Sequence, residues 1–203
     1  MTLFEFDKNV RKNNGITYLA GVDEAGRGPL AGPVFAAAVV LPPEFECEGI
    51  RDSKKLSEKK REELESIIKE NALAYAVVSS DVPVIEEINI LNATLLAMKT
   101  AVNKLKISAE LVLVDGNRSP DLTQDHECLV KGDDKSLSVA AASILAKVAR
   151  DRFVKEVLAT KYPEYEFEKH KGYGTKLHFE KIAEFGPCPE HRLSFLRKKF
   201  GNM

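Results

Sequence analysis

Apolar and polar residues follow two periods along this chain, and together they predict alternating strands and helices. Short apolar runs are typical of strands, whereas apolar residues three or four positions apart indicate helices. Strands are expected at residues 18–22, 34–41, 73–79, 110–114 and 127–130. Helices are expected at residues 58–70, 85–105, 137–159, 176–184 and 192–199.

Two of these segments are especially informative. Residues 34–41 are apolar throughout, as expected of a strand that is covered on both faces, and three alanines at 140–142 open the long helix at 137–159. Such small side chains allow a helix to approach the layer beneath it closely. The order of elements predicts one α/β domain over residues 1–203, with a mixed sheet flanked by helices and a helical appendage at about 160–203.

Composition limits the class of protein. The 203 residues are 44% hydrophobic, enough for one buried core. The chain has three widely spaced cysteines, and the sequence lacks both a signal peptide and an apolar run long enough to span a membrane. These features predict a cytoplasmic protein that does not associate with membranes.

The net charge is −1, from 30 basic and 31 acidic residues. As a sum, this value argues weakly against nucleic-acid binding, because phosphate backbones are held by positive charge. The basic residues are nevertheless clustered at 51–61, 169–176 and 192–199. Each cluster is either a solvated helix face or part of a basic groove, and the sequence leaves both interpretations open.

Carboxylates occur where predicted strands or loops end, in three places. They are Asp23 with Glu24, Asp115, and Asp133 with Asp134. Each place has an ordinary explanation as an exposed corner, a turn or a helix cap. Together they are typical of an active site, because open α/β sheets place such sites beside their strand ends.

Asp23 and Glu24 are adjacent, and neighbouring side chains of a strand point to opposite faces. Both can serve one site only if the chain leaves strand geometry there, which Gly26 and Gly28 would allow. Carboxylates that converge repel one another unless a cation lies among them. Oxygen ligands without His or Cys favour Mg²⁺ or Mn²⁺ over zinc.

The segment from Asp23 to Val34, which reads DEAGRGPLAGPV, resembles the signature of the bacterial ribonuclease HII family. The resemblance continues in order as far as residue 195. It includes DSK at 52–54, NAT at 92–94, VDG at 114–116, KGD at 131–133, AASILAK at 141–147, HKGYGTK at 170–176 and HRLSF at 191–195.

This resemblance implies a ribonuclease H-like fold and an endonuclease that cuts RNA–DNA hybrids and DNA duplexes containing embedded ribonucleotides. It implies two-metal hydrolysis on the 5′ side of the ribonucleotide, which leaves a 5′-phosphate and a 3′-hydroxyl. The implied metal-binding and catalytic residues are Asp23, Glu24, Asp115 and Asp133. Asp133 is preferred to Asp134 because the family's aspartate directly follows the glycine.

The resemblance also implies how substrate is read. The turn formed by Gly26, Arg27 and Gly28 is similar to the family's reader of the ribose 2′-hydroxyl, and Tyr173 resembles the tyrosine that contacts the following deoxyribose. A plain turn and an ordinary aromatic are the alternatives. Lys54, Lys169 and Lys171 are expected to contact phosphates.

Other polar residues of the matched segments have structural interpretations. Lys147 and Arg150 are expected to pair with Asp151. Three histidines, which the metal site does not need, are expected on the surface or in packing: His170, His178 and His191.

Competing functions remain from several classes. They are a nuclease or recombinase of the same fold acting on DNA, a catalytically silent module that binds hybrid duplexes, and a phosphatase acting on small esters. The related ribonuclease HIII type is not expected, because only about fifteen residues precede the first strand and the turn reads Gly-Arg-Gly. A monomer is expected.

Overall fold

A mixed sheet of five strands forms the centre of the molecule, in the order β3-β2-β1-β4-β5. β1 pairs with β2 in an antiparallel manner and with β4 in a parallel one. β2–β3 is antiparallel and β4–β5 is parallel. The strands are β1 (Leu19–Ala25), β2 (Val34–Val40), β3 (Ala74–Ser80), β4 (Leu111–Asp115) and β5 (Asp125–Leu129).

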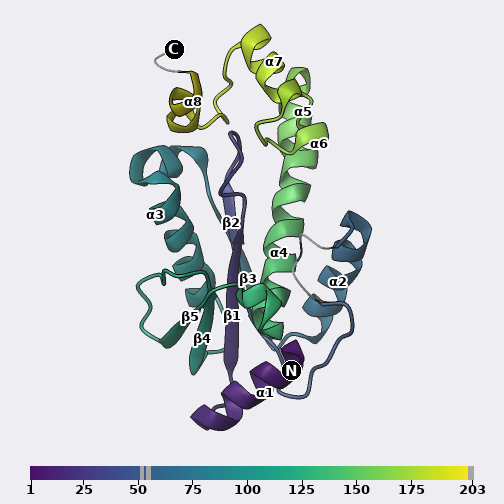
Figure 1. Cartoon of the computed structure of the whole chain (residues 1–203), viewed down its shortest axis with the longest axis vertical. Helices are drawn as coiled ribbons and strands as arrows, with labels where there is room; N and C mark the ends of the chain where they lie inside the picture. Colours follow the sequence, from purple (N-terminus) through teal and green to yellow (C-terminus); the bar gives the residue numbers. More distant parts are fainter. Residues whose placement is uncertain (51–52, 54–55, 201–203) are drawn as a thin grey trace.

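Helices cover both faces of this sheet in the computed structural model, which describes residues 1–50, 53 and 56–200. One face lies against α3 (Val82–Asn103), and the other lies against α4 (Leu137–Phe153) with α2 (Glu58–Asn71) outside it (Figure 1). The faces of β2 divide accordingly, with Ala38 among the residues packed around α3 and Val39 among those packed around α4. The predicted α/β fold with a mixed sheet, and a central strand covered on both faces, are confirmed.

β1 and α4 are in close contact because Gly21 has no side chain. A Cβ built on Gly21 would lie 2.1 Å from the carbonyl carbon of Ser138 and 2.3 Å from the nitrogen of Val139. The first turns of α4 continue with Ala140, Ala141 and Ala142, each fully buried. The predicted close approach of this helix is therefore confirmed, and it holds α4 directly over the strand that carries Asp23.

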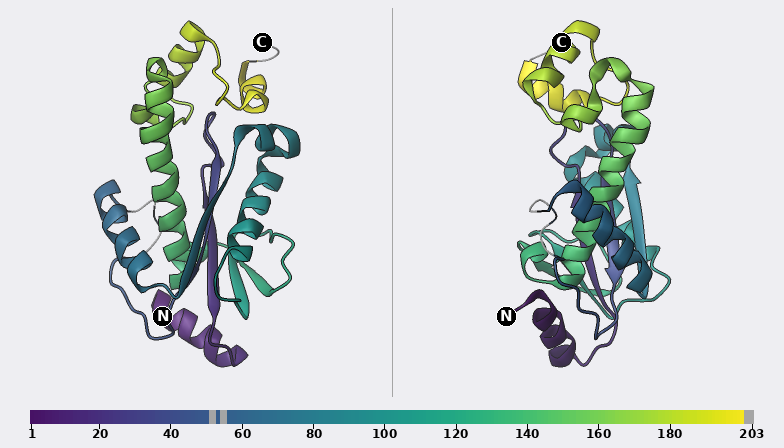
Figure 2. Two further views of the ribbon diagram at one scale, coloured as in Figure 1. Left: turned by 180° about the vertical axis from the view of Figure 1, so that it is seen from behind. Right: turned by 90° about the vertical axis from the view of Figure 1, so that its right-hand side faces the viewer.

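A helix at the N-terminus, α1 (Leu3–Asn14), was not among the predicted elements. Its ends carry ordinary signals: Thr2 and Glu5 form a capping box, and Gly15 ends the helix in the left-handed conformation. Asp7 on this helix accepts two hydrogen bonds from Ser138, at the start of α4. α1 therefore closes the end of the molecule that is distant from the C-terminal helices (Figure 2).

Two predicted helices are less regular than their apolar patterns indicate. The helix expected at 85–105 begins at Val82 and is kinked at Asn89, whose φ is 66°. The Asn89 side chain accepts hydrogen bonds from the N–H groups of Leu91 and Asn92, so it caps the second segment. The helix expected at 137–159 is α4 followed by a π-helical turn, Val154–Leu158, and a short α5 (Ala159–Lys161).

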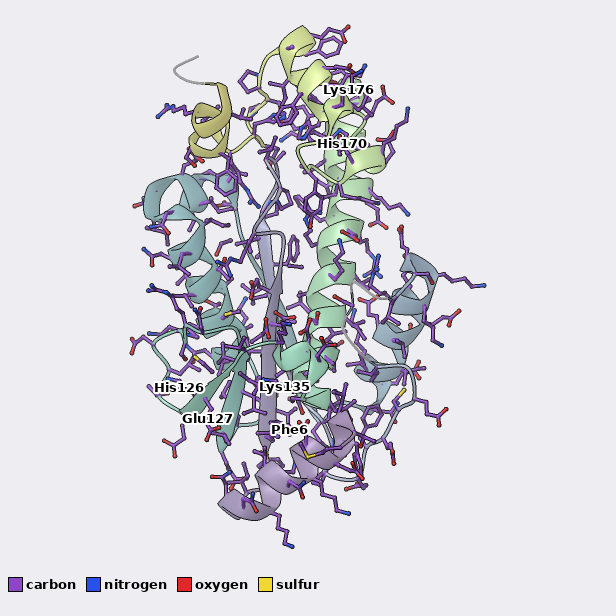
Figure 3. The ribbon with its side chains drawn as sticks, in the orientation of Figure 1. Phe6, His126, Glu127, Lys135, His170 and Lys176 are labelled. Carbon is purple, nitrogen blue, oxygen red and sulfur yellow. The ribbon has the colours of Figure 1, made fainter. Side chains whose placement is uncertain are left out.

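The C-terminal helices gather at one end of the sheet, around a small core of their own. They are α6 (Phe167–His170), α7 (Lys176–Phe185) and α8 (Leu193–Phe200). Phe167, Ile182 and Leu196 bury their side chains there against Leu30, from the loop between β1 and β2. Figure 3 shows His170 and Lys176 at this end of the molecule. No helix of the described residues is long and apolar enough to cross a membrane.

Candidate active site

Three carboxylates converge where β1 and β4 end side by side. Each of Asp23, Glu24 and Asp115 offers an oxygen atom, and these atoms all lie within 4.8 Å of one another. The parallel pairing of β1 with β4 reaches Val22 opposite Val114, so the next residue of each strand is a carboxylate. Their convergence therefore follows from the register of two neighbouring parallel strands.

The sequence predicted that Asp23 and Glu24 could share a site only if the chain left strand geometry there, and this prediction is wrong. β1 continues through Ala25, with Asp23 and Glu24 paired with Ala37 and Ala36 of β2, so the chain retains strand geometry. The pairing of β1 with β4 stops at Val22, which leaves that edge of β1 open beyond it. The longer Glu24 side chain can turn around this open edge toward Asp23.

Asp23 is the most buried of the three, with 5% of its surface exposed. Burial, together with the charges of Glu24 and Asp115, raises the pKa of Asp23 well above its usual value. Hydrogen bonds from the Glu24 N–H, at 2.7 Å, and from Ser143 act in the opposite direction. A bound cation would relieve the repulsion that these carboxylates share.

Asp133 is not one of the three members of this group, although the turn that carries it is bonded to the group. The turn Gly132–Asp134 is anchored to the site because the Gly132 N–H donates to Asp115 Oδ1 at 2.6 Å. Asp133 is buried, whereas Asp134 is exposed. This difference favours Asp133 over Asp134 as a ligand, and its participation remains a prediction.

The glycine-rich turn after β1 forms one wall of the same site. Gly26 has a φ of 99°, and a Cβ there would lie 3.1 Å from the Pro33 carbonyl oxygen and 3.2 Å from Arg150 Nε. A side chain at this position would therefore be both strained and crowded. Arg27 extends toward solvent and pairs with Glu24 at 3.2 Å.

Arg192 anchors this turn through hydrogen bonds to its backbone, a role that was not predicted from the sequence. Its guanidinium group is fully buried and donates to the carbonyl oxygens of Gly26, Arg27, Pro29 and Gly32, at 2.7–3.0 Å. Burial and the charge of Arg150 lower the pKa of Arg192 to about 9. Arg192 was included in a basic cluster interpreted as a helix face or groove. Its place in the HRLSF motif was the available signal.

Tyr173 lies beside the glycine-rich turn. A Cβ on Gly28 would lie 3.7 Å from Tyr173 Cε1. The Arg150 guanidinium lies 5.3 Å from the centre of the Tyr173 ring, and the side chain of Tyr173 is 42% exposed. The structure thus brings Tyr173, Gly28 and the carboxylates together at one cavity.

This cavity encloses about 450 Å³. Its lining includes the carboxylates of Asp23, Glu24 and Asp115 together with the basic side chains of Arg61 and Lys147 and the residues Ser53 and Ser143. Such a surface can hold cations and phosphate oxygens next to each other.

The expected ion pairs of Asp151 are present, and an additional one is found. Lys147 lies 2.8 Å and Arg150 lies 3.5 Å from Asp151, as the sequence analysis predicted. Arg61 also contacts Asp151, at 3.6 Å. These contacts connect α2 and α4 next to the cavity, which Arg61 and Lys147 line.

The predicted phosphate-binding lysines differ in their surroundings. Lys54 lies outside the described residues. Lys169 and Lys171 are not among the described residues that line the cavity. Lys169 pairs with Glu166. The Lys171 amine is buried and has no hydrogen-bond partner among the described residues, and burial lowers its pKa.

The three histidines of the C-terminal part are all buried. Their expected role in packing is confirmed, and the alternative of a surface position is wrong. His170 and His178 stack with ring centres 4.1 Å apart, and His178 Nε2 lies 3.0 Å from His191 Nε2.

Solved structures show the same fold. Ribonuclease H2 from Pyrococcus horikoshii OT3 matches with a TM-score of 0.72 at 30% identity, over 87% of this chain and 93% of that one. The ribonuclease HII of the complex with PCNA from Archaeoglobus fulgidus matches with a TM-score of 0.67 at 27% identity, over 91% and 95%. The chain is therefore a nuclease-type protein of the ribonuclease H fold, with its carboxylates at the ends of β1 and β4.

Sequence comparison identifies the family. The family model described as Ribonuclease HII matches residues 20–203. The ribonuclease HII of Caldicellulosiruptor bescii is 57% identical over 96% of this chain and 93% of its own length. That of Neisseria meningitidis serogroup C is 54% identical over 87% and 91%. The chain belongs to the ribonuclease HII family, which consists of endonucleases that cleave the RNA of RNA–DNA hybrids.

Proposed function

We propose that this member of the ribonuclease HII family cuts on the 5′ side of ribonucleotides embedded in duplex DNA, as well as within RNA–DNA hybrids. The products would be a 5′-phosphate and a 3′-hydroxyl. The observation that carries the proposal is the shared cavity of Asp23, Glu24 and Asp115 with the turn at Gly26–Gly28. The three carboxylates proposed to carry out hydrolysis therefore lie beside the turn that is proposed to contact the sugar.

We propose Mg²⁺ or Mn²⁺ as the metal. The donor set fits such an ion, because it consists of carboxylate oxygens close enough to share one, and Asp23 is buried among like charges. Asp23, Glu24, Asp115 and Asp133 would hold the metal. When bound, two divalent ions supply the charge that activates the attacking water and stabilises the leaving 3′-oxygen. A fold relative, the Bst ribonuclease HIII, is known in complex with Mn²⁺.

The turn at Gly26–Gly28 would recognise the ribose. The buried Arg192 guanidinium fixes the carbonyl groups of Gly26 and Arg27 by hydrogen bonds. Backbone groups that are held in this way can approach a sugar without a side chain intervening, and only RNA offers a 2′-hydroxyl there.

Tyr173 would pack against the deoxyribose that follows the ribonucleotide. Its ring lines the cavity, with the Arg150 guanidinium nearby as a support. Lys54, Lys169 and Lys171 are proposed to bind phosphates farther along the duplex. Lys171 differs from Lys169 in that its amine has no hydrogen-bond partner among the described residues, whereas Lys169 pairs with Glu166.

We further propose that the enzyme acts as a cytoplasmic monomer. The support is chemical: Cys47, Cys128 and Cys188 are all free thiols, as a reducing compartment maintains them. Sedimentation of the purified protein tests the monomer directly, because a dimer would have twice the mass of 22.5 kDa.

Mapping of cleavage sites tests the proposed activity. Three labelled duplexes of the same sequence are compared, with a single ribonucleotide, with a continuous RNA strand, or with DNA alone. Each is incubated with Mg²⁺, with Mn²⁺ or with a chelator. We expect metal-dependent cuts on the 5′ side of the single ribonucleotide and none in the all-DNA duplex.

Other results would support the competing functions. Cleavage of the all-DNA duplex would indicate a general nuclease, and binding to hybrids without cleavage would indicate a silent module. Hydrolysis confined to small phosphate esters would indicate a phosphatase. Cleavage only within continuous RNA would contradict the proposed action at single ribonucleotides while leaving the family activity intact.

A further inference from the structure

A chain of hydrogen bonds runs through the C-terminal part and ends on Tyr173. The Cys188 N–H donates to His191 Nδ1 at 2.9 Å, so a neutral His191 carries its proton on Nε2. That proton faces His178 Nε2 at 3.0 Å, which must then accept it. The proton of His178 is therefore on Nδ1, from which it donates to the Tyr173 carbonyl oxygen at 3.0 Å.

Burial keeps this chain in one protonation state. It lowers the pKa of His178 to about 3 and of His191 to about 4, so both rings are neutral at neutral pH. Burial also raises the pKa of Cys188 to about 11, so its thiol, whose sulfur lies 3.1 Å from His191 Nδ1, keeps its proton. Each hydrogen bond then has one fixed direction.

The chain does not have the chemistry of a metal site. Both nitrogens of His178 and of His191 already have hydrogen-bond partners. Among the described residues, the group with metal-site spacing is the carboxylate group of β1 and β4. The histidines are consequently available for positioning rather than for ligation.

The segment at His191 and Arg192 is also hydrogen-bonded to the loop between β1 and β2, which contains the turn proposed to read the ribose. The Arg192 N–H donates to the Leu30 carbonyl oxygen at 2.7 Å, and the Leu30 N–H donates to the carbonyl oxygen of Gly172 at 2.8 Å. Gly172 precedes Tyr173, and Arg192 follows His191. Tyr173 is therefore connected to the loop both through the backbone and through the two histidines.

The Tyr173 peptide is held on both sides. Its N–H donates to the His170 carbonyl oxygen at 2.9 Å, and its own carbonyl oxygen accepts from Thr175 at 2.8 Å as well as from His178. The ring itself is partly exposed at the cavity. The direction of the ring therefore depends on how firmly this peptide is fixed.

We propose that His178 and His191 are positioning residues, which fix Tyr173 against the ribose-reading turn and thereby set the preference for single ribonucleotides over continuous RNA. The inference rests on the proposed function of Tyr173 as the residue that packs on the following deoxyribose. It adds residues that touch neither the substrate nor the metal, and that act through Tyr173.

A pair of variants at one position separates positioning from packing. His178→Leu removes both hydrogen bonds of the ring. His178→Asn retains a donor close to the place of Nδ1, so it can still bond to the Tyr173 carbonyl oxygen. Ile182→Ala is the matched control, because Ile182 is buried in the same core and has no hydrogen bond to Tyr173.

The readout is the ratio of kcat/KM on the single-ribonucleotide duplex to that on the continuous hybrid. His178→Leu should lower this ratio by roughly three- to tenfold, as expected for the loss of one buried hydrogen bond. His178→Asn and Ile182→Ala should retain a ratio close to that of the wild type, even where their melting temperatures fall. A ratio lowered equally in Ile182→Ala and His178→Leu would overturn the proposal.

A second readout does not depend on activity. The chain has five tyrosines, so ¹³C-labelled tyrosine gives few ring signals, and Tyr173→Ala identifies the one of interest. That signal should shift or broaden in His178→Leu and return in His178→Asn. Unchanged Tyr173 signals in His178→Leu would overturn the positioning role, whatever the kinetics.

The same set distinguishes failure of this inference from failure of the proposed function. Equal losses on both substrates in Tyr173→Ala would refute Tyr173 as a junction reader, and the NMR comparison would still decide whether the histidines position it. In the Tyr173→Ala background, His178→Leu should lower the ratio no further. A further, additive loss would show that His178 acts by another route and would overturn the proposal.

Discussion

Arg192 Nη2 donates a hydrogen bond to the carbonyl oxygen of Gly26 at 2.7 Å, across 166 positions of sequence. The residue just before α8 is thereby joined to the turn that follows β1, the strand that carries Asp23 and Glu24. With its other bonds to the same loop, Arg192 determines where the turn lies relative to the carboxylates.

Arg192→Lys should therefore lower both stability and activity. A lysine cannot reproduce the fork of donors, and several buried carbonyl groups would lose their partners. We expect a loss of about 2–4 kcal/mol in the free energy of unfolding and a fall of roughly tenfold or more in kcat/KM. Arg197→Lys, an exposed position of α8, is the control. Equal kinetics for the two variants would show that the turn does not need this anchor.

Asp133→Asn should nearly abolish cleavage and leave duplex binding largely intact, because metal ligation serves the reaction more than docking. Asp134→Asn should retain most activity, because Asp134 is exposed. Side-by-side rates with Mg²⁺ and binding assays with a hybrid duplex measure both effects. The reverse ranking would mean that Asp134 is the ligand.

Asp23→Asn should abolish cleavage and raise the melting temperature of the metal-free protein. The variant removes one charge from a buried group of like charges, and we expect a gain of about 1 kcal/mol, or roughly 2–4 °C. Added Mg²⁺ should narrow the difference, since it stabilises the wild type through binding. Asp125→Asn, at an exposed position on β5, should show neither effect. A lower melting temperature for metal-free Asp23→Asn would contradict this account.

Tyr173→Phe should retain most activity, whereas Tyr173→Ala should slow cleavage at a single ribonucleotide. Aromatic stacking on a nucleic-acid base is worth about 1–3 kcal/mol, and for packing on a sugar we expect a loss of the same order, roughly ten- to a hundredfold in rate if the contact is made in the transition state. The loss should be smaller on continuous hybrids, which have no junction. Tyr75→Ala is the matched control, because Tyr75 is also exposed and has a basic side chain, Lys69, over its ring.

Gly21→Ala should disrupt the contact between β1 and α4. Its Cβ would meet the backbone of Ser138 and Val139, which cannot move without shifting the helix. We expect a loss of about 3 kcal/mol or more. Gly15→Ala tests backbone strain alone, because Gly15 has a φ of 65° and open space around it, and it should cost about 1 kcal/mol. Similar melting temperatures for the two variants would show that the contact is not tight.

Much of the fold could be predicted from local patterns. Strands β1 to β4 and the principal helices follow from apolar periodicity, because these elements present apolar faces to their neighbours. Strand β5 also lies near its predicted position, but its residues are largely exposed. The ends of α1 also carried readable signals, Thr2 with Glu5 and then Gly15, although the helix was missed. The kink at Asn89 was hidden by a continuous apolar pattern, since a single side chain that caps a helix leaves the surrounding period unchanged.

The sequence by itself determined which chemistry the site has: carboxylates at strand ends, a glycine-rich turn and a family signature, all read from short contiguous segments. Only the tertiary structure decided how these groups meet. Asp23 and Asp115 become neighbours through the parallel register of β1 with β4, and a carboxylate oxygen of Glu24 lies within 4.8 Å of theirs. Arg192 acquires its partners from a turn 166 positions away in the chain. Buried polar groups must find hydrogen bonds wherever the fold brings donors and acceptors together, and no local pattern encodes those partners.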